Sequence, residues 1–260
     1  MIDFGISGRK ALICGGSSGL GYGCAEALAK CGVKLILNSR NEERLQKACN
    51  SLRQKTGAEI ILAAADITTD KGRKLVIEKA GDVDILVNNA GGPPIGHFKN
   101  WDREDWIRAI NENMLTSIEM IKAVIDSMVS KKFGRIVNIT SGSVKSPIPE
   151  LGLSNGARSG LTGFVAGIAR EYAQYNVTIN NLLPGQFNTA RIEALIEKRA
   201  KENGITSQEL RAKLEEENPS KRFGEIGEFG VACAWICSTH SSYLVGQNIL
   251  IDGGRFNSTF

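Results

Sequence analysis

The stretch Lys10-Ala11-Leu12-Ile13-Cys14-Gly15-Gly16-Ser17-Ser18-Gly19-Leu20-Gly21 joins a short apolar run to a cluster of glycines and then to a helical pattern. The apolar run ends at the first glycine, and from Leu20 onward apolar residues recur at spacings of three and four. Glycines permit positive φ and close backbone approach, and the free N–H groups at a helix start favour an anion. The stretch therefore predicts a strand, a tight turn and a helix that cradle a phosphate. The simpler alternative is a glycine-rich connector without a ligand.

Length and charge set the outer limits for the rest of the chain. The 260 residues suit one large α/β domain or two small ones. The net charge of +4 is small and spread along the chain, so no nucleic-acid partner is expected, whereas an anionic cofactor or substrate fits this balance. No apolar run approaches the ~20 residues of a membrane span, and no signal peptide is evident at the N-terminus. We therefore expect no membrane partner.

The six cysteines point to a reducing compartment. No two of them form a CxxC pair and the chain has only two histidines, so a structural zinc site is not expected. Cys233 and Cys237 stand one helical turn apart, and we interpret them as buried reduced thiols. The expected location is the cytoplasm.

Strand-like and helix-like segments alternate along the whole chain. The sequence predicts seven strands, at 11–14, 33–38, 59–64, 83–87, 135–139, 177–183 and 247–251. Helical patterns separate them, and parallel strands need such crossovers. Because no linker or repeat divides the chain, we predict a single-domain, doubly wound, Rossmann-like α/β fold over residues 1–260, with helices on both faces of a parallel sheet.

In such sheets, ligands bind beyond the carboxyl ends of the strands. The residues that follow the predicted strands should therefore share one rim. The candidate cofactor-binding residues on this rim are Gly15, Ser17, Ser18, Gly19, Leu20, Gly21, Arg40, Asp66, Ile67, Asn89, Ala90, Gly91, Pro184, Gly185 and Thr189.

Arg40 bears on the choice between the two nicotinamide dinucleotides. An acidic residue after the second strand binds the ribose hydroxyls of NAD, whereas a cation accommodates the 2′-phosphate of NADP. This chain has Ser39-Arg40 at that point and no acid. A guanidinium suits bidentate phosphate contact, so we predict NADP in preference to NAD. The alternative is a solvated surface arginine.

Several motifs in order resemble those of the short-chain dehydrogenase/reductase family, and 3-oxoacyl-carrier-protein reductases in particular. They are Cys14-Gly15-x-x-x-Gly19-x-Gly21, Asn88-Asn89-Ala90-Gly91, Gly134 to Ile139, Pro184-Gly185 and Asp252-Gly253-Gly254, with Cys14 where threonine is usual. The resemblance implies an NADP-dependent oxidoreductase that transfers a hydride to or from a carbonyl or secondary alcohol. It also implies a small-molecule or acyl substrate, a helical substrate lid at about 189–217 and a homotetramer, with a dimer as the alternative.

The family's catalytic set is Asn, Ser, Tyr and Lys, with Tyr-x-x-x-Lys on one helix. Asn113 and Ser141 match its first two members. Ser154 stands at the tyrosine position, and Arg158 stands where lysine is expected. A serine hydroxyl is a much weaker acid than tyrosine, and arginine keeps its charge without acting as a proton donor. We therefore expect Arg158 to stabilise a developing alkoxide, with a water between Ser141, Ser154 and Arg158 as proton source.

Three other readings stay open. His97, Lys145 and Glu150 are loop candidates for a substitute acid, although ordinary polar loop residues explain them more simply. The protein as a whole is alternatively a catalytically weak or inactive nucleotide sensor, or an oligomer partner on the same fold. A redox-neutral lyase similar to halohydrin dehalogenases is disfavoured, because those proteins keep the tyrosine and lose the glycine turn.

Overall fold

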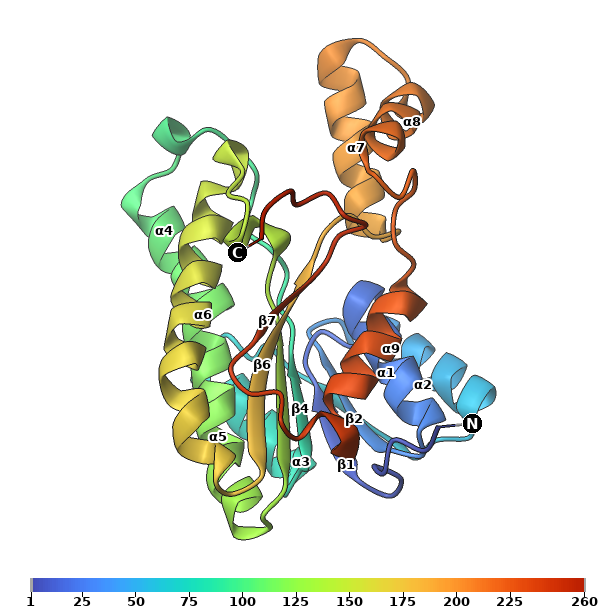
Figure 1. The fold of residues 1–260 in the computed structure, drawn as a ribbon. Helices are drawn as coiled ribbons and strands as arrows, with labels where there is room; N and C mark the ends of the chain where they lie inside the picture. The colour runs from blue at the N-terminus through green and yellow to red at the C-terminus, as the bar shows by residue number, and fades with distance from the viewer. Residues whose placement is uncertain (1, 260) are drawn as a thin grey trace.

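Seven parallel strands form one sheet in the order β3-β2-β1-β4-β5-β6-β7 in the computed structural model, which describes residues 2–259 (Figure 1). The strands are β1 (Lys10–Ile13), β2 (Lys34–Ser39), β3 (Ile60–Ala64), β4 (Ile85–Asn88), β5 (Gly134–Ile139), β6 (Val177–Pro184) and β7 (Asn248–Ile251). The strand order reverses between β1 and β4, and ligands bind at such a switch point in open α/β sheets. The predicted doubly wound, seven-stranded fold is confirmed.

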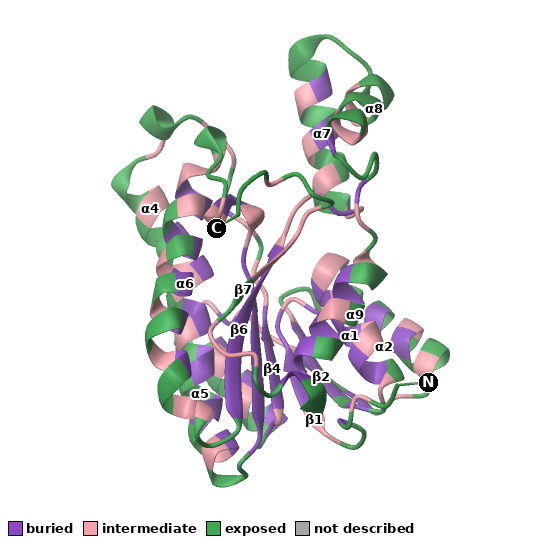
Figure 2. Cartoon of the chain, in the orientation of Figure 1, coloured by how far each residue is buried: buried purple, intermediate pink, exposed green. Residues whose placement is uncertain are grey.

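Two layers of helices cover the two faces of the sheet (Figure 1). One layer contains α1 (Gly19–Lys30), α2 (Glu42–Thr56) and α9 (Ile226–Ile236), and the other contains α3 (Asp70–Ala80), α5 (Thr116–Ser130) and α6 (Gly152–Ala173). Side chains alternate across a strand, so Ala11 and Ile13 enter the first layer while Leu12 and Cys14 enter the second. Because both faces are covered, the central strands β1, β4, β5 and β6 are buried almost throughout, whereas the edge strands β3 and β7 are more exposed (Figure 2).

Small residues allow α1 and α9 to touch. A Cβ atom on Gly23 would lie 2.3 Å from the Ile226 carbonyl oxygen, and one on Gly230 would lie 2.1 Å from the Gly23 carbonyl oxygen. The two backbones therefore meet with no side chain between them, which draws the C-terminal helix against the helix that follows the glycine turn.

The charged stretch at 189–217 forms two helices, α7 (Ala190–Asn203) and α8 (Ser207–Glu217), which stand apart from the sheet at its upper edge (Figure 1). Gly204 ends α7 with φ +66°, a conformation that glycine adopts without strain. Thr206 and Glu209 then form a capping box that starts α8.

The long helical segment between β4 and β5 runs without a break from Arg103 to Ser130. A π-helical turn, Asn111–Leu115, joins α4 (Arg103–Ile110) to α5. The Thr116 hydroxyl donates to the Asn111 carbonyl oxygen at 2.8 Å across this turn. Asn113 is buried within this widened turn, and Glu112 and Thr116 lie at the edge of the sheet.

Four asparagine side chains form a ladder across the sheet from β4 to β7. Asn88 Nδ2 donates to Asn138 Oδ1 at 2.9 Å, and Asn138 Nδ2 donates to Asn181 Oδ1 at 3.0 Å. Asn181 Nδ2 then donates to Asn248 Oδ1 at 2.8 Å. The ladder joins β4, β5, β6 and β7 through side chains as well as through the backbone, and it lies next to the rim.

Within residues 2–259, no helix is long and apolar enough to cross a membrane. The same residues contain no group of three or more His, Cys, Asp or Glu that could hold a metal ion. Cys233 and Cys237 are free and fully buried, and burial helps to raise the pKa of both thiols.

Candidate active site

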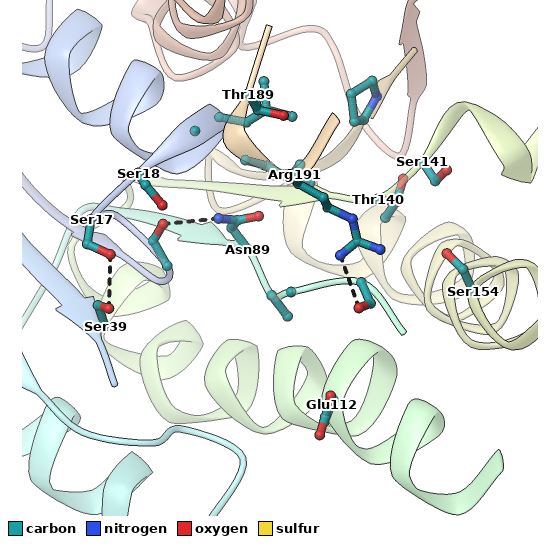
Figure 3. Close-up of a pocket in the computed structure, with 18 of the residues that line it drawn as sticks. Ser17, Ser18, Ser39, Asn89, Glu112, Thr140, Ser141, Ser154, Thr189 and Arg191 are labelled. Atoms are coloured by element: carbon teal, nitrogen blue, oxygen red, sulfur yellow. Dashed lines mark hydrogen bonds between the residues drawn. The ribbon is translucent and has the colours of Figure 1, made fainter. Parts of the chain in front are cut away.

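A cavity of about 590 Å³ opens at the carboxyl ends of the strands (Figure 3). It is lined by every predicted cofactor residue except Gly21, and also by Ser141, Ser154 and Arg158. The carboxyl ends of parallel strands meet at one edge of a sheet, which explains why residues at the ends of β1 to β6 converge there.

The glycine turn forms one wall of the cavity. Gly15 and Gly19 have φ of +59° and +57°. Gly21 lies behind the turn, where a Cβ atom would approach the Gly15 carbonyl oxygen to 2.4 Å. Asn89 Nδ2 donates to that same oxygen at 3.2 Å, so the loop after β4 braces the turn. The N-cap residue Ser18 makes no side-chain cap bond, which leaves the first N–H groups of α1 free to meet an anion.

Cations lie at the end of the cavity beside β2. The Arg40 side chain is 71% exposed, and its approach of 4.0 Å to Asp66 is too long and too solvated to hold it. Arg44, on the first turn of α2, lines the same region. The Ser17 hydroxyl donates to that of Ser39 at 3.0 Å, linking the glycine turn to the end of β2. Arg44 was missed from the sequence, although it stands one helical turn beyond Arg40.

Two serine hydroxyls lie at the opposite end of the cavity, near Thr140 (Figure 3). Ser141 Oγ accepts hydrogen bonds from the Ser143 N–H at 3.1 Å and from the Ser143 hydroxyl at 2.9 Å. Both lone pairs of Ser141 are thereby occupied, so its own proton is left to donate into the cavity. Ser154 lies on α6 and is largely buried.

The Arg158 guanidinium is fixed by backbone oxygens. Nη1 donates to the carbonyl oxygens of Ile139 at 2.7 Å and Thr140 at 2.6 Å, and Nη2 makes a long contact of 3.5 Å with that of Ala90. Burial, with a smaller effect from the charge of Arg191, lowers the pKa of Arg158 to about 10. The group is still a cation at neutral pH, and among residues 2–259 it forms no salt bridge.

Some predicted catalytic candidates do not line the cavity. Asn113 is buried in the π-helical turn, where Nδ2 donates to the Ala109 carbonyl oxygen at 3.3 Å. Its Oδ1 finds no hydrogen-bond partner within the described residues. The loop alternatives His97, Lys145 and Glu150 also lie outside the lining.

Several other lining residues were not predicted from the sequence. Glu112 and Thr116 reach the cavity from the π-helical turn and the start of α5, and Arg191 reaches it from the first turn of α7. The Arg191 guanidinium donates to the carbonyl oxygens of Gly92 and Pro93 at 3.0 and 3.2 Å. No local pattern marks Arg191, because it meets this loop only after α7 has returned over the sheet.

Curated relatives match almost the full length of the chain. The chain is 30% identical over 256 residues to a 2,3-dihydroxy-2,3-dihydro-p-cumate dehydrogenase of Pseudomonas putida, which covers 96% of this chain and 95% of that protein. It is also 30% identical to the NADPH-dependent reductase BacG of Bacillus subtilis, over 97% of this chain and 100% of that protein.

A solved structure shares the arrangement of the whole molecule. L-sorbose reductase from Gluconobacter frateurii, complexed with NADPH and L-sorbose, is 29% identical and superposes with a TM-score of 0.94 over 99% of this chain and 100% of that one. Residues 9–200 match the short chain dehydrogenase family, and this match spans more than half of the sequence. The chain therefore belongs to the short chain dehydrogenase family.

Proposed function

We propose that this protein is an NADP-dependent oxidoreductase that transfers a hydride between the nicotinamide cofactor and a carbonyl or secondary alcohol substrate, either 3-oxoacyl-like or a small ketone. The observation that carries the proposal is the continuity of the cavity, which runs from the glycine turn to Ser141, Ser154 and Arg158. The NADPH-dependent relative and the NADPH complex described above support the choice of cofactor.

The residues around the glycine turn fit a dinucleotide. The positive φ of Gly15 and Gly19 and the uncapped start of α1 allow a pyrophosphate to lie close to the backbone of the turn. We assign the 2′-phosphate to Arg40 and Arg44, since two guanidiniums at one exposed end of the cavity suit a dianion. Asp66 and Ile67 flank the adenine side, and Thr189 closes over Gly19.

The bound cofactor would supply or accept the hydride, and the protein would act on the oxygen of the substrate. Ser141 donates its remaining proton in a hydrogen bond to that oxygen. Arg158 places a fixed positive charge at the same end, which stabilises the negative charge that develops during reduction. A preorganised donor of this kind is worth about 10²–10³ in kcat.

Ser154-x-x-x-Arg158 stands in place of Tyr-x-x-x-Lys in this proposal. Neither side chain releases a proton at neutral pH, since the pKa of Arg158 is about 10 and an alcohol is a weaker acid than a phenol. We assign the proton to a water held by Ser141, Ser154 and Arg158. Asn113, which matches the asparagine of the family's catalytic set, lies outside the cavity lining, and its buried position suits a role in shaping the π-helical turn.

Helices α7 and α8 form a lid in this proposal, and the molecule assembles as a homotetramer. The Arg191 contacts to Gly92 and Pro93 tie the first turn of the lid to the loop after β4. The apolar residues Ile121, Ile125 and Met128 of α5 are buried against the chain's own sheet, so they are not available for contacts between subunits. Light scattering after size exclusion tests the tetramer.

NADPH oxidation with a panel of small ketones and 3-oxoacyl thioesters tests the activity. Ser141→Ala should lower kcat by about 10²–10³ and leave the NADPH dissociation constant unchanged. Ser146→Ala is the matched control, since Ser146 is exposed on the same loop and does not line the cavity. NADPH binding without turnover of any compound would favour the nucleotide-sensor alternative.

A further inference from the structure

Arg191 is held in a fixed orientation over the substrate end of the cavity. Two of its five N–H groups donate to the carbonyl oxygens of Gly92 and Pro93. The absence of a side chain at Gly92 makes room for this contact, since a Cβ atom there would lie 2.4 Å from Arg191 Nη2. The loop therefore orients the guanidinium, and three N–H groups remain for a ligand.

Within residues 2–259, neither of the two cavity arginines near the serines forms an ion pair with a carboxylate. Glu193, on the same turn as Arg191, pairs instead with Arg211 of α8. Arg158 donates only to backbone carbonyl oxygens. Glu112 lines the same cavity but forms no ion pair with either arginine in the part of the chain that the structure describes.

The two charges act on each other across this end of the cavity. The positive charge of Arg191 adds to burial in lowering the pKa of Arg158, so the guanidiniums lie within electrostatic range. Arg191 is exposed when the whole residue is considered. Its guanidinium is nevertheless partly shielded from water by the surrounding protein, and this desolvation lowers the pKa of Arg191. Two like charges facing one cavity without a counterion favour an anionic ligand between them.

The anion has two possible sources, the cofactor's pyrophosphate and the substrate. The pyrophosphate belongs beside the glycine turn, near Ser17 and Ser18. The Arg191 guanidinium lies between Asn89 and Ser154, on the side of the two candidate catalytic serines (Figure 3). This position favours the substrate.

We propose, on the basis of the function proposed above, that the substrate is an oxo acid whose carboxylate is bound by Arg191. The carbonyl oxygen of the substrate lies at Ser141 and Arg158, and the carboxylate fixes which carbonyl compounds enter in that orientation. Arg191 is thus a specificity-determining residue for a class of substrates that carry a negative charge close to the reacting carbonyl.

Titration calorimetry on the protein saturated with NADP⁺ tests this inference. The probes are 2-oxopentanoate and 4-oxopentanoate, each compared with its methyl ester, which keeps the carbonyl and removes the charge. At least one acid should bind about tenfold or more tightly than its ester, as expected for a charge-assisted pair. Arg191→Gln should remove this preference while leaving ester binding and the NADPH dissociation constant unchanged. Arg103→Gln, an exposed arginine at the start of α4 outside the cavity, is the matched control.

Two results would overturn the inference. One is equal binding of acid and ester for both probes. The other is a loss of NADPH affinity in Arg191→Gln as large as the loss of acid binding, which would assign the guanidinium to the cofactor's phosphates. A failure of the proposed function looks different, because the acid preference would then persist in the calorimeter while NADPH oxidation is absent with every carbonyl compound.

Discussion

Replacing Asn138 by alanine should destabilise the protein more than any other single change in the asparagine ladder. Asn138 is fully buried, accepts from Asn88 at 2.9 Å and donates to Asn181 at 3.0 Å. Each bond contributes about 1 kcal/mol net, and a buried partner left unpaired costs about 1–3 kcal/mol. Asn88 Nδ2 keeps a contact of 3.3 Å with the Ser117 carbonyl oxygen, whereas Asn181 Oδ1 loses its ladder donor.

We therefore expect Asn138→Ala to lower the free energy of unfolding by about 2–4 kcal/mol, a large share of the ~5–15 kcal/mol typical of a folded domain. Asn248→Ala is the matched control. Asn248 is an exposed residue at the end of the ladder and accepts a single bond from Asn181, so its loss should cost about 1 kcal/mol or less.

Urea denaturation followed by tryptophan fluorescence, at one fixed protein concentration, measures both variants. A double-mutant cycle between Asn88 and Asn138 should give a coupling energy of about 0.5–3 kcal/mol. Equal losses for Asn138→Ala and Asn248→Ala, or a coupling energy of zero, would refute the reasoning that the ladder stabilises the four strands as a connected unit.

Three further changes test the cofactor site and one surface ion pair. Gly21→Ala places a Cβ atom 2.4 Å from a backbone oxygen of the turn, so the NADPH dissociation constant should rise about tenfold or more. Gly163→Ala is the control, because a Cβ atom there meets no atom within 4 Å, and it should leave the dissociation constant unchanged. Fluorescence titration with NADPH measures both variants. Arg40→Ser should weaken NADPH by about 10–100-fold and NADH much less, and equal losses would contradict the 2′-phosphate assignment. Arg222 holds the pKa of Glu228 at about 2, below its usual 4.5, so this pair stabilises the folded state above pH 4.5 and loses its effect as the pH falls towards 2. Glu228→Gln should cost about 0.2–1 kcal/mol at pH 7, since solvent screens the pair, and the difference from the unmutated protein should shrink below pH 4.5; a constant difference in urea denaturation would contradict this.

Local patterns were sufficient to predict the sheet and most of its rim. Apolar runs that stop at glycine, asparagine or aspartate marked where strands end, and parallel pairing then brought Asp66, Asn89 and Pro184 to one edge. Such signals are short-range, because strand ends and glycine turns are encoded by adjacent residues.

The residues that were missed depend on long-range geometry. Arg191 reaches the loop after β4 from about a hundred positions further along the chain, and no periodicity encodes that return. The family motif predicted that Asn113 belongs to the catalytic set. In the structure this residue lies in a π-helical turn, and the neighbouring Glu112 lines the cavity instead. The sequence predicted one helical lid over about 189–217, because the residues on both sides of Gly204 are similarly charged. In the structure, Gly204 ends α7.

Arg158 both carries a positive charge in the cavity and fixes the position of the backbone next to Ser141. Its Nη1 group donates to the carbonyl oxygen of Ile139, the last residue of β5, and to that of Thr140. The guanidinium therefore fixes the backbone immediately before Ser141. A lysine ammonium is a point charge on a flexible stem, whereas the planar guanidinium makes these bonds in one fixed geometry. Its pKa of about 10 keeps the charge in place throughout the neutral range. Arg158 is therefore suited to orient a hydrogen-bond donor and to stabilise negative charge, and the proton itself has to come from a different group in the same cavity.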